Sequence, residues 1–430
     1  MNIQKKTIAL SLEAFAKGSL FIISMILFCS IAGGSDQIPA AAQKQPIALT
    51  GGSIHPVDGA VIEKGTVLFE KGKITALGAD IRIPSDAIKV DISGKHVYPG
   101  LIDVNSQLGL VEINSVRGTL DIQEKGNINP DVRAETALNP DSERIPVTRS
   151  NGIALACALP SGGVLSGKAA LFMLDGWTWE SMTLKAPVGM VVSGPNMDVL
   201  EKAFTEARAY KAARDAAGKK ETPFHKTDVR WEAMLPVLKG ELPVWMWAKS
   251  LPEIESAVEW ADREKVKLVI LGGLESPLAA DLLKRKNIPV VVTPILSLPR
   301  GRDDDYDEPF TVPAKLFREG VKFCISGSSS EGNDRNLPYH AAMASAYGLP
   351  KEEALKSVTQ YAAEILSAAD RVGTLAKGKD ATLIVASGDP LEITTQIEKM
   401  YIQGREIDLN NKQKTLYRKY QEKYRQLSGK

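Results

Sequence analysis

The sequence predicts an α/β protein in which a (β/α)8 TIM-like barrel is inserted into a small composite β-sandwich formed by both termini. Short strand-like runs separated by Gly, Asp and Lys occur near both ends of the chain, and neither group is large enough for a core of its own. Between them, apolar runs alternate with amphipathic helical runs, which is typical of parallel strands joined by crossover helices. A doubly wound open sheet is the alternative fold.

The expected segments follow in order along the chain. They are an export signal at 1–34, a linker at 35–45, the sandwich from 46–98 together with 372–409, the barrel at 99–371, and an amphipathic helix at 410–430. The barrel segment, about 270 residues long, has the usual size of this fold. Its expected strands are 101–104, 153–158, 189–192, 244–247, 268–271, 290–292 and 323–325.

Composition narrows the classes of function. Lys and Arg number 53 against 52 Asp and Glu, so the net charge of +1 provides no field that would attract nucleic acid, and we expect no nucleic-acid partner. The chain has only 4 His, whereas a hydrolytic metal site usually uses several. The scarcity of histidine therefore argues against an ordinary hydrolytic metal centre.

The first residues resemble an export signal. Lys5, Lys6 and Lys17 precede an apolar run at 19–31, and small residues follow it. We expect a signal peptide at about 1–32 and an exported, periplasmic or secreted protein, with no membrane contact beyond this segment. An uncleaved N-terminal anchor is the alternative. After cleavage two cysteines remain, Cys157 and Cys324, and their apolar surroundings predict buried thiols rather than a disulfide.

Near the other end, 410–426 has the pattern of an amphipathic helix. Leu416, Tyr417, Tyr420 and Tyr424 form an apolar stripe opposed by Lys and Arg residues. We expect this stripe to pack across the barrel or the sandwich. A surface helix for a partner or for lipid is the alternative.

Three phrases together resemble those of a known family: VYPGLID at 97–103, GTLAKGKDATLIV at 373–385 and IQGR at 402–405. On these phrases the chain resembles the amidohydrolase superfamily, in particular the imidazolonepropionase-like and related exported amidohydrolases. The resemblance covers essentially the whole mature chain. It implies the barrel and sandwich described above, and hydrolysis of non-peptide carbon–nitrogen bonds with the help of a divalent metal.

The positions that correspond to the family's metal ligands hold other residues in this chain. Asn105 and Gln107 occupy the His-x-His pair after the first barrel strand, Trp247 and Leu271 occupy the histidine positions on strands five and six, and no aspartate follows strand eight in register. Neutral amides are poor zinc ligands. We therefore expect no cofactor and a metal site that has been lost, unless a loop carboxylate, Glu331 or Asp334, substitutes.

Polar residues elsewhere on the expected barrel mouth are the remaining candidates. A Ser/Gly-rich loop at 161–168 with Lys168 could bind an anion, and His340 could act as a general acid or base, with His225 as a weaker candidate. Lys168 and His340 are the predicted catalytic residues. The predicted substrate-binding residues are Asn105, Gln107, Trp247, Ser328, Arg335 and Asn336.

Three functional hypotheses follow from these residues. The first is an exported pseudoenzyme of amidohydrolase fold that binds a small molecule in the barrel mouth, or a partner, without cleaving it. The second is a metal-dependent hydrolase with unusual ligands. The third is a metal-free hydrolase that uses His340 or the Ser/Gly loop. A homo-oligomer is compatible with each of them.

Overall fold

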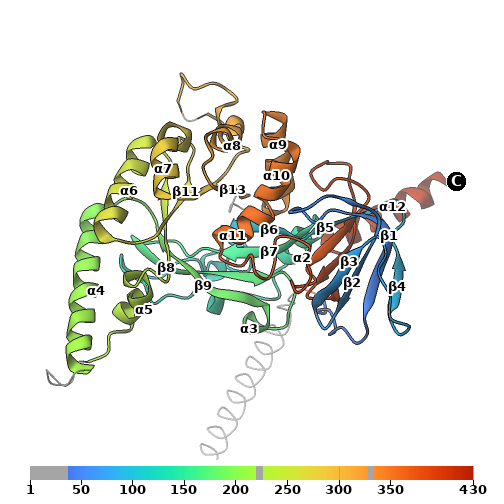
Figure 1. The fold of residues 1–430 in the computed structure, drawn as a ribbon, viewed down its shortest axis with the longest axis horizontal. Helices are drawn as coiled ribbons and strands as arrows, with labels where there is room; N and C mark the ends of the chain where they lie inside the picture. The colour runs from blue at the N-terminus through green and yellow to red at the C-terminus, as the bar shows by residue number, and fades with distance from the viewer. Residues whose placement is uncertain (1–36, 219–225, 300, 328–332, 430) are drawn as a thin grey trace, which may run out of the picture. The chain divides into compact units, whose positions relative to one another are not determined.

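The computed structural model describes residues 37–218, 226–299, 301–327 and 333–429. The predicted export signal lies outside these residues. All helices and strands below belong to the compact unit Pro39–Lys430 and form two sheets of eight strands each, with helices packed on the second sheet (Figure 1). Within the described residues no helix has the length and apolar character needed to cross a bilayer.

The first sheet combines strands from both ends of the chain, as expected. Its spatial order is β16-β15-β14-β5-β1-β2-β3, with β4 beside β1. The antiparallel pairing of β5 with β14 joins the two termini. The strands are β1 (Ile47–Ile54), β2 (Ile62–Glu70), β3 (Lys73–Gly78), β4 (Ile88–Asp91), β5 (His96–Pro99), β14 (Leu383–Ala386), β15 (Ile397–Ile402) and β16 (Arg405–Glu406).

Both faces of this sheet are covered. In β14, Leu383 and Val385 belong to a core with Phe69 and Tyr401, whereas Ile384 belongs to a core shared with the second sheet. Successive side chains of a strand point to opposite faces, so β14 separates the two cores. The sheet is therefore bound to the rest of the unit through an apolar interface.

The second sheet is the barrel sheet, and it confirms the predicted architecture. Its strands lie in chain order, β6 to β13, with β6 and β13 at the two ends of the pairing path. They are β6 (Leu101–Ser106), β7 (Ile153–Ala158), β8 (Leu165–Met173), β9 (Thr183–Val192), β10 (Val244–Ala248), β11 (Leu268–Gly272), β12 (Val290–Val292) and β13 (Phe323–Ile325).

The third strand of the barrel sheet departs from the prediction. β8 runs antiparallel to both β7 and β9, whereas the other adjacent pairs are parallel. Sequence reasoning read 161–168 as a loop because of its glycines. In the structure Gly162 and Gly163 adopt φ of +82° and +67°, and the chain turns there into β8. A hairpin thus replaces one βα crossover.

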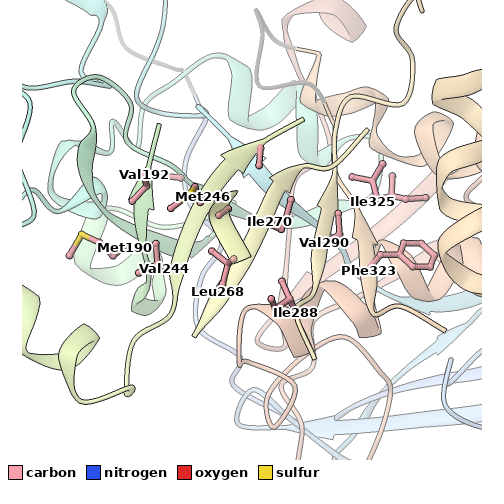
Figure 2. Packing of buried hydrophobic residues seen from close by; sticks show 14 of the residues in the cluster. Met190, Val192, Val244, Met246, Leu268, Ile270, Ile288, Val290, Phe323 and Ile325 are labelled. Atoms are coloured by element: carbon pink, nitrogen blue, oxygen red, sulfur yellow. The ribbon is translucent and has the colours of Figure 1, made fainter. Parts of the chain in front are cut away.

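Alternation along the barrel strands separates an outer layer from an inner one. The outer side chains, among them Met190, Val244, Ile270 and Val290, form one large core with the helices (Figure 2). Trp245, Leu271 and Cys324 belong instead to the inner core. Cys157 and Cys324 are both buried and unpaired, as predicted.

The helices lie mainly in the connections between barrel strands. They are α2 (Arg144–Arg149), α3 (Trp179–Met182), α4 (Met197–Gly218), α5 (Val229–Leu238), α6 (Leu251–Glu264), α7 (Ala280–Lys286), α8 (Glu308–Glu319), α9 (Leu337–Ala346), α10 (Lys351–Ser357), α11 (Gln360–Ile365) and α12 (Lys412–Ser428). The prediction that the last helix packs across the barrel or sandwich is wrong, because no residue of α12 is buried.

Candidate functional site at the barrel mouth

The mouth of the barrel is built by the loops at the carboxyl ends of its parallel strands, where barrel proteins carry their functional residues. Six polar residues form a network there, which we call the seam network because it bridges the two end strands, β6 and β13, and the loops beside them. Its members are Asp103, Asn105, Ser106, Thr293, Ser326 and Asp334, and each is at most 3% exposed.

Asp103 and Ser326 form the centre of the seam network. The Ser326 hydroxyl donates a short hydrogen bond to Oδ1 of Asp103. The same oxygen accepts from the backbone N–H of Gly327 at 3.1 Å, and the Asn105 N–H donates to Ser326 Oγ at 2.8 Å. These bonds join the end of β6 to the end of β13, which are not paired by a backbone ladder.

Asn105 takes the first of the two positions where the family has histidine. Its Nδ2 donates to Oγ1 of Thr293 at 3.4 Å, and Thr293 Oγ1 in turn donates to the Gly327 carbonyl at 2.6 Å. The amide is therefore directed across the barrel toward the residue that follows β12. It is buried and already has a protein partner.

Two loop carboxylates, Glu331 and Asp334, are the candidates for replacement metal ligands, and the structure describes Asp334. It begins a single 3-10 turn, Asp334–Asn336, and is 1% exposed. Ser106 Oγ donates to its Oδ1 at 2.7 Å and accepts from the Leu108 N–H at 3.0 Å. The carboxyl thus belongs to the seam network.

The two buried carboxyl groups influence each other. Burial raises the pKa of Asp103, and the neighbouring Asp334 raises it further. Burial also raises the pKa of Asp334, although the hydrogen bond from Ser106 opposes that shift. Oδ2 of Asp103 is buried without a hydrogen-bond partner among the described residues. An oxygen in that environment favours the protonated, uncharged acid.

His340 lies on α9 and is 2% exposed. Its Nδ1 accepts from the backbone N–H groups of Ile295 and Leu296 at 3.3 and 3.4 Å, so the ring proton is expected on Nε2. Burial lowers the pKa of His340 to about 4, which keeps the ring neutral at pH 7. The imidazole therefore fixes the loop that follows β12.

Lys168 lies away from this histidine, in β8. It is half-buried beside the insertion that follows β6, where its N–H donates to the Val132 carbonyl at 2.9 Å. Burial lowers the pKa of Lys168, and the nearby Glu135 opposes that shift. The two predicted catalytic residues thus lie in different parts of the structure. Lys168 is in β8, and His340 is on α9 in contact with the loop after β12.

The other predicted binding residues are more dispersed. Trp247, at the end of β10, is half-buried with the Lys249 ammonium 5.8 Å from its ring centre. The Gln107 carbonyl accepts from two backbone N–H groups in the loop that follows it. Arg335 is exposed, its carbonyl accepting from Asn151 at 2.6 Å, and the half-buried Asn336 begins α9. Three further candidates, His225, Ser328 and Glu331, lie outside the described residues.

Hollows open around the rim of the barrel. One of about 610 Å³ lies between the Ser/Gly loop and the start of α4, and its lining includes Gly163, Ser193 and Asn196. A second, of about 300 Å³, lies in the insertion after β6 and includes Arg133 in its lining. A third, of about 410 Å³, lies between the loops after β11 and β12. The Ser/Gly loop thus lines a cavity, whereas Lys168 does not belong to that lining.

The donor groups at the mouth can be compared with what the family's metal would require. The seam network offers amide, hydroxyl and carboxyl oxygens and no imidazole or thiolate, a set that fits zinc poorly because zinc prefers imidazole and thiolate ligands. Across the described ranges, no three or more His, Cys, Asp and Glu side chains are grouped so that they could hold a metal ion.

Sequence reasoning missed four members of the seam network: Asp103, Ser106, Thr293 and Ser326. Asp103 stood within the family phrase at 97–103 and was read only as part of it. Ser326 stood where an aspartate was sought after strand eight. A buried acid followed by polar residues at 105 and 106 was the available signal, but its partners lie more than 180 residues away along the chain.

Comparisons with known proteins find similarity to amidohydrolases. A family model described as "Amidohydrolase family" matches residues 313–408. "Amidohydrolase tasK" of Hapsidospora irregularis is 24% identical over 387 residues, which are 79% of this chain and 39% of the relative. This chain therefore spans about two fifths of that protein's length.

Solved structures extend the likeness over most of the fold. An amidohydrolase from Thermotoga maritima MSB8 is 28% identical, with 84% of this chain and 99% of that chain covered and a TM-score of 0.78. An adenosine deaminase from Xanthomonas campestris with bound zinc is 12% identical, with 90% and 99% covered and a TM-score of 0.53, which is a likeness of fold alone. Together with the three sequence phrases and the barrel and composite sheet, these comparisons show that the chain is similar to proteins of the amidohydrolase family over most of its length.

Proposed function

We propose that this protein is an exported, ligand-binding member of the superfamily that has lost metal-dependent hydrolysis of carbon–nitrogen bonds. The observation that carries the proposal is the position of Asn105. It replaces the first histidine of the family's pair, it is buried, and its amide donates to Thr293 inside the seam network. Hydrolysis by this family needs an ion that activates water, and the resemblance puts one of the ion's ligands at the position that Asn105 takes here.

The electrostatics of the mouth support the same proposal. A divalent cation is held by ionised carboxylates or imidazoles, whereas burial raises the pKa of Asp103 to about 7, so that this carboxyl is only partly ionised at neutral pH. An ion bound there would have to displace any proton on the fully buried Asp103, whose Oδ1 already accepts the hydrogen bonds from Ser326 and Gly327. The seam network therefore favours a mouth without a cation.

Residues around the rim of the barrel mouth support the proposal of ligand binding. The hollow beside the Ser/Gly loop offers polar backbone groups, and, outside the lining of that hollow, Trp247 with Lys249 offers a half-buried aromatic face next to a cation. Such a mixture of apolar wall and few polar groups is characteristic of small-molecule sites. We propose a small polar molecule related to the family's amide substrates as the ligand.

The experiment is a thermal-stability screen with N-acyl amino acids, cyclic amides and ureas, followed by product analysis. We expect a ligand that raises the melting temperature without forming product. Trp247→Ala should abolish the rise, whereas Trp177→Ala, at a position 68% exposed in the β8–β9 connection, should leave it unchanged. Product formation that disappears with a chelator would overturn the proposal.

One observation favours a second candidate, metal-free hydrolysis. The fully buried Asp103 has a raised pKa and an oxygen without a described partner, which are properties of a general acid. This candidate predicts turnover that a chelator does not affect and that Asp103→Asn abolishes. If His340→Ala lost turnover while Asp103→Asn remained active, the catalytic group would be His340 and not Asp103.

A further inference from the structure

Among the described residues, helix α12 is held to the rest of the protein through its first turn. Asn411 caps the helix by accepting from the Lys414 N–H at 2.8 Å, and its Nδ2 donates to Ser150 Oγ at 2.9 Å. Beyond the cap no residue of α12 is buried, and the helix carries the C-terminal end of the described chain (Figure 1). Helices of this length gain most of their stability from packing, so α12 lacks the contacts that usually hold such a helix.

The exposed helix nevertheless has an apolar stripe. With about 100° between successive residues, its five large apolar side chains fall within an arc of about 100°. Each is between 43% and 64% exposed. The stripe consists of Leu416, Tyr417, Tyr420, Tyr424 and Leu427.

Lysines border one edge of this stripe. At the same angular spacing, Lys412, Lys419 and Lys423 lie within about 60° of that edge, whereas the half-buried Lys414, Arg425 and Arg418 lie about 60–100° beyond the other edge, toward the opposite face. The acid of the helix, Glu422, lies on the face opposite the stripe and pairs with Arg425 at 2.7 Å. Six cations and one acid give α12 a net charge of +5 (6 − 1), in a chain whose total is +1.

The apolar stripe and the cations of α12 indicate which kind of partner the helix would bind. Pairing of α12 with a second copy through the stripe would bring together two helices that each carry a net charge of +5, which is unfavourable. An anionic lipid surface instead matches every feature: the stripe enters the interface, tyrosines are favoured at that depth, and flanking lysines extend to the phosphates. We propose that α12 is a surface anchor that lies in the headgroup region of an anionic bilayer, in contrast to the expectation of no membrane contact beyond the signal segment.

The test is vesicle flotation of residues 35–430, which contain the whole compact unit Pro39–Lys430 and leave out the apolar segment at 19–31. We expect binding to vesicles of phosphatidylglycerol and phosphatidylcholine, weakening with added salt, and no binding to phosphatidylcholine alone. Lys419→Glu with Lys423→Glu should weaken binding at least about tenfold. Tyr420→Ser with Tyr424→Ser should also weaken it.

The matched control is Lys202→Glu with Lys284→Glu, which makes the same change of charge at exposed positions on α4 and α7. This control should retain most of the binding. Equal loss in the control and in the α12 variant would show that only total charge matters, and would overturn the proposal. So would an absence of binding to the anionic vesicles, including the case in which α12 serves an acidic protein instead.

Discussion

Asp103 is fully buried in the seam network, and burial together with Asp334 raises its pKa above that of the same carboxyl in the unfolded chain. The folded protein therefore holds this proton at pH values where the unfolded chain has released it. Stability from this group is complete below the ordinary carboxyl pKa of about 4 and is lost as pH rises toward the raised value. We expect the Asp103 contribution to lower the melting temperature as pH increases through that range.

The measurement is the melting temperature as a function of pH for the wild type and for Asp103→Asn. The variant keeps an acceptor for Ser326 but has no proton to lose, so its melting temperature should fall less with rising pH. Asp80→Asn, at an exposed loop position, should keep the wild-type slope. Identical slopes in all three proteins would contradict the assignment of a proton to the seam network.

His340 is predicted to contribute stability through its acceptor nitrogen. Its Nδ1 is the partner of the Ile295 and Leu296 N–H groups, and removal of a buried acceptor costs about 1–3 kcal/mol. Urea unfolding should show this loss in His340→Leu. His340→Asn places an amide oxygen near the original nitrogen and should restore part of it. If both variants were as stable as the wild type, the loop would not depend on this acceptor.

At the scale of elements, a buried ion cluster ties the two sheets together. Asp175, directly after β8, accepts from Arg149 of α2 at 3.1 Å and from Arg405 of β16 at 2.6 Å. The Ala40 N–H also donates to its carboxyl group at 3.2 Å. The N-terminal segment, the barrel and the last strand of the composite sheet thus meet at one carboxylate.

Removal of this carboxylate should be costly. Asp175→Ala leaves Arg149, with its side chain 4% exposed, without its buried partner, and such a loss is worth about 3–5 kcal/mol. Asp215→Ala, which removes the exposed pair with Lys211 on α4, should cost less than about 1 kcal/mol. Chemical unfolding of the two variants makes the comparison. Similar small losses in both would show that the cluster does not hold the sheets together.

Much of this architecture could be predicted from periodicity. The parallel barrel strands are short apolar runs buried on both faces, so the runs at 153–158, 290–292 and 323–325 were located with their observed bounds. β8 was missed because two glycines at its entrance have the same signature as a loop. The sequence has helical periodicity throughout 351–369, but the structure divides this segment into α10 and α11 at Thr359, whose φ of −134° and ψ of −88° are not helical.

The site was less predictable for a different physical reason. Which residues occupy the ligand positions could be read from their distance to the phrase at 97–103, and Asn105 was identified in this way. What those residues do depends on contacts between distant segments, such as Asp103 with Ser326 or Ser106 with Asp334. Side-chain partners of that kind follow from the closed barrel and not from local sequence.

At the scale of the whole molecule, the seam network stands where the two ends of the barrel sheet meet. The resemblance puts the family's metal ligands at the same mouth, and Asn105 is the seam-network residue that takes one of their positions. The proposed replacement of the metal by the seam network keeps the barrel fold but removes the ion that would activate water.

The metal content of the purified protein tests this exchange most directly. Elemental mass spectrometry with and without added zinc, combined with the melting temperature in each state, should show well under one ion per chain and no zinc-dependent stabilisation. A stoichiometric ion that raises the melting temperature, and that is lost in Asp103→Asn, would contradict the proposed loss of the metal site. It would indicate metal-dependent chemistry.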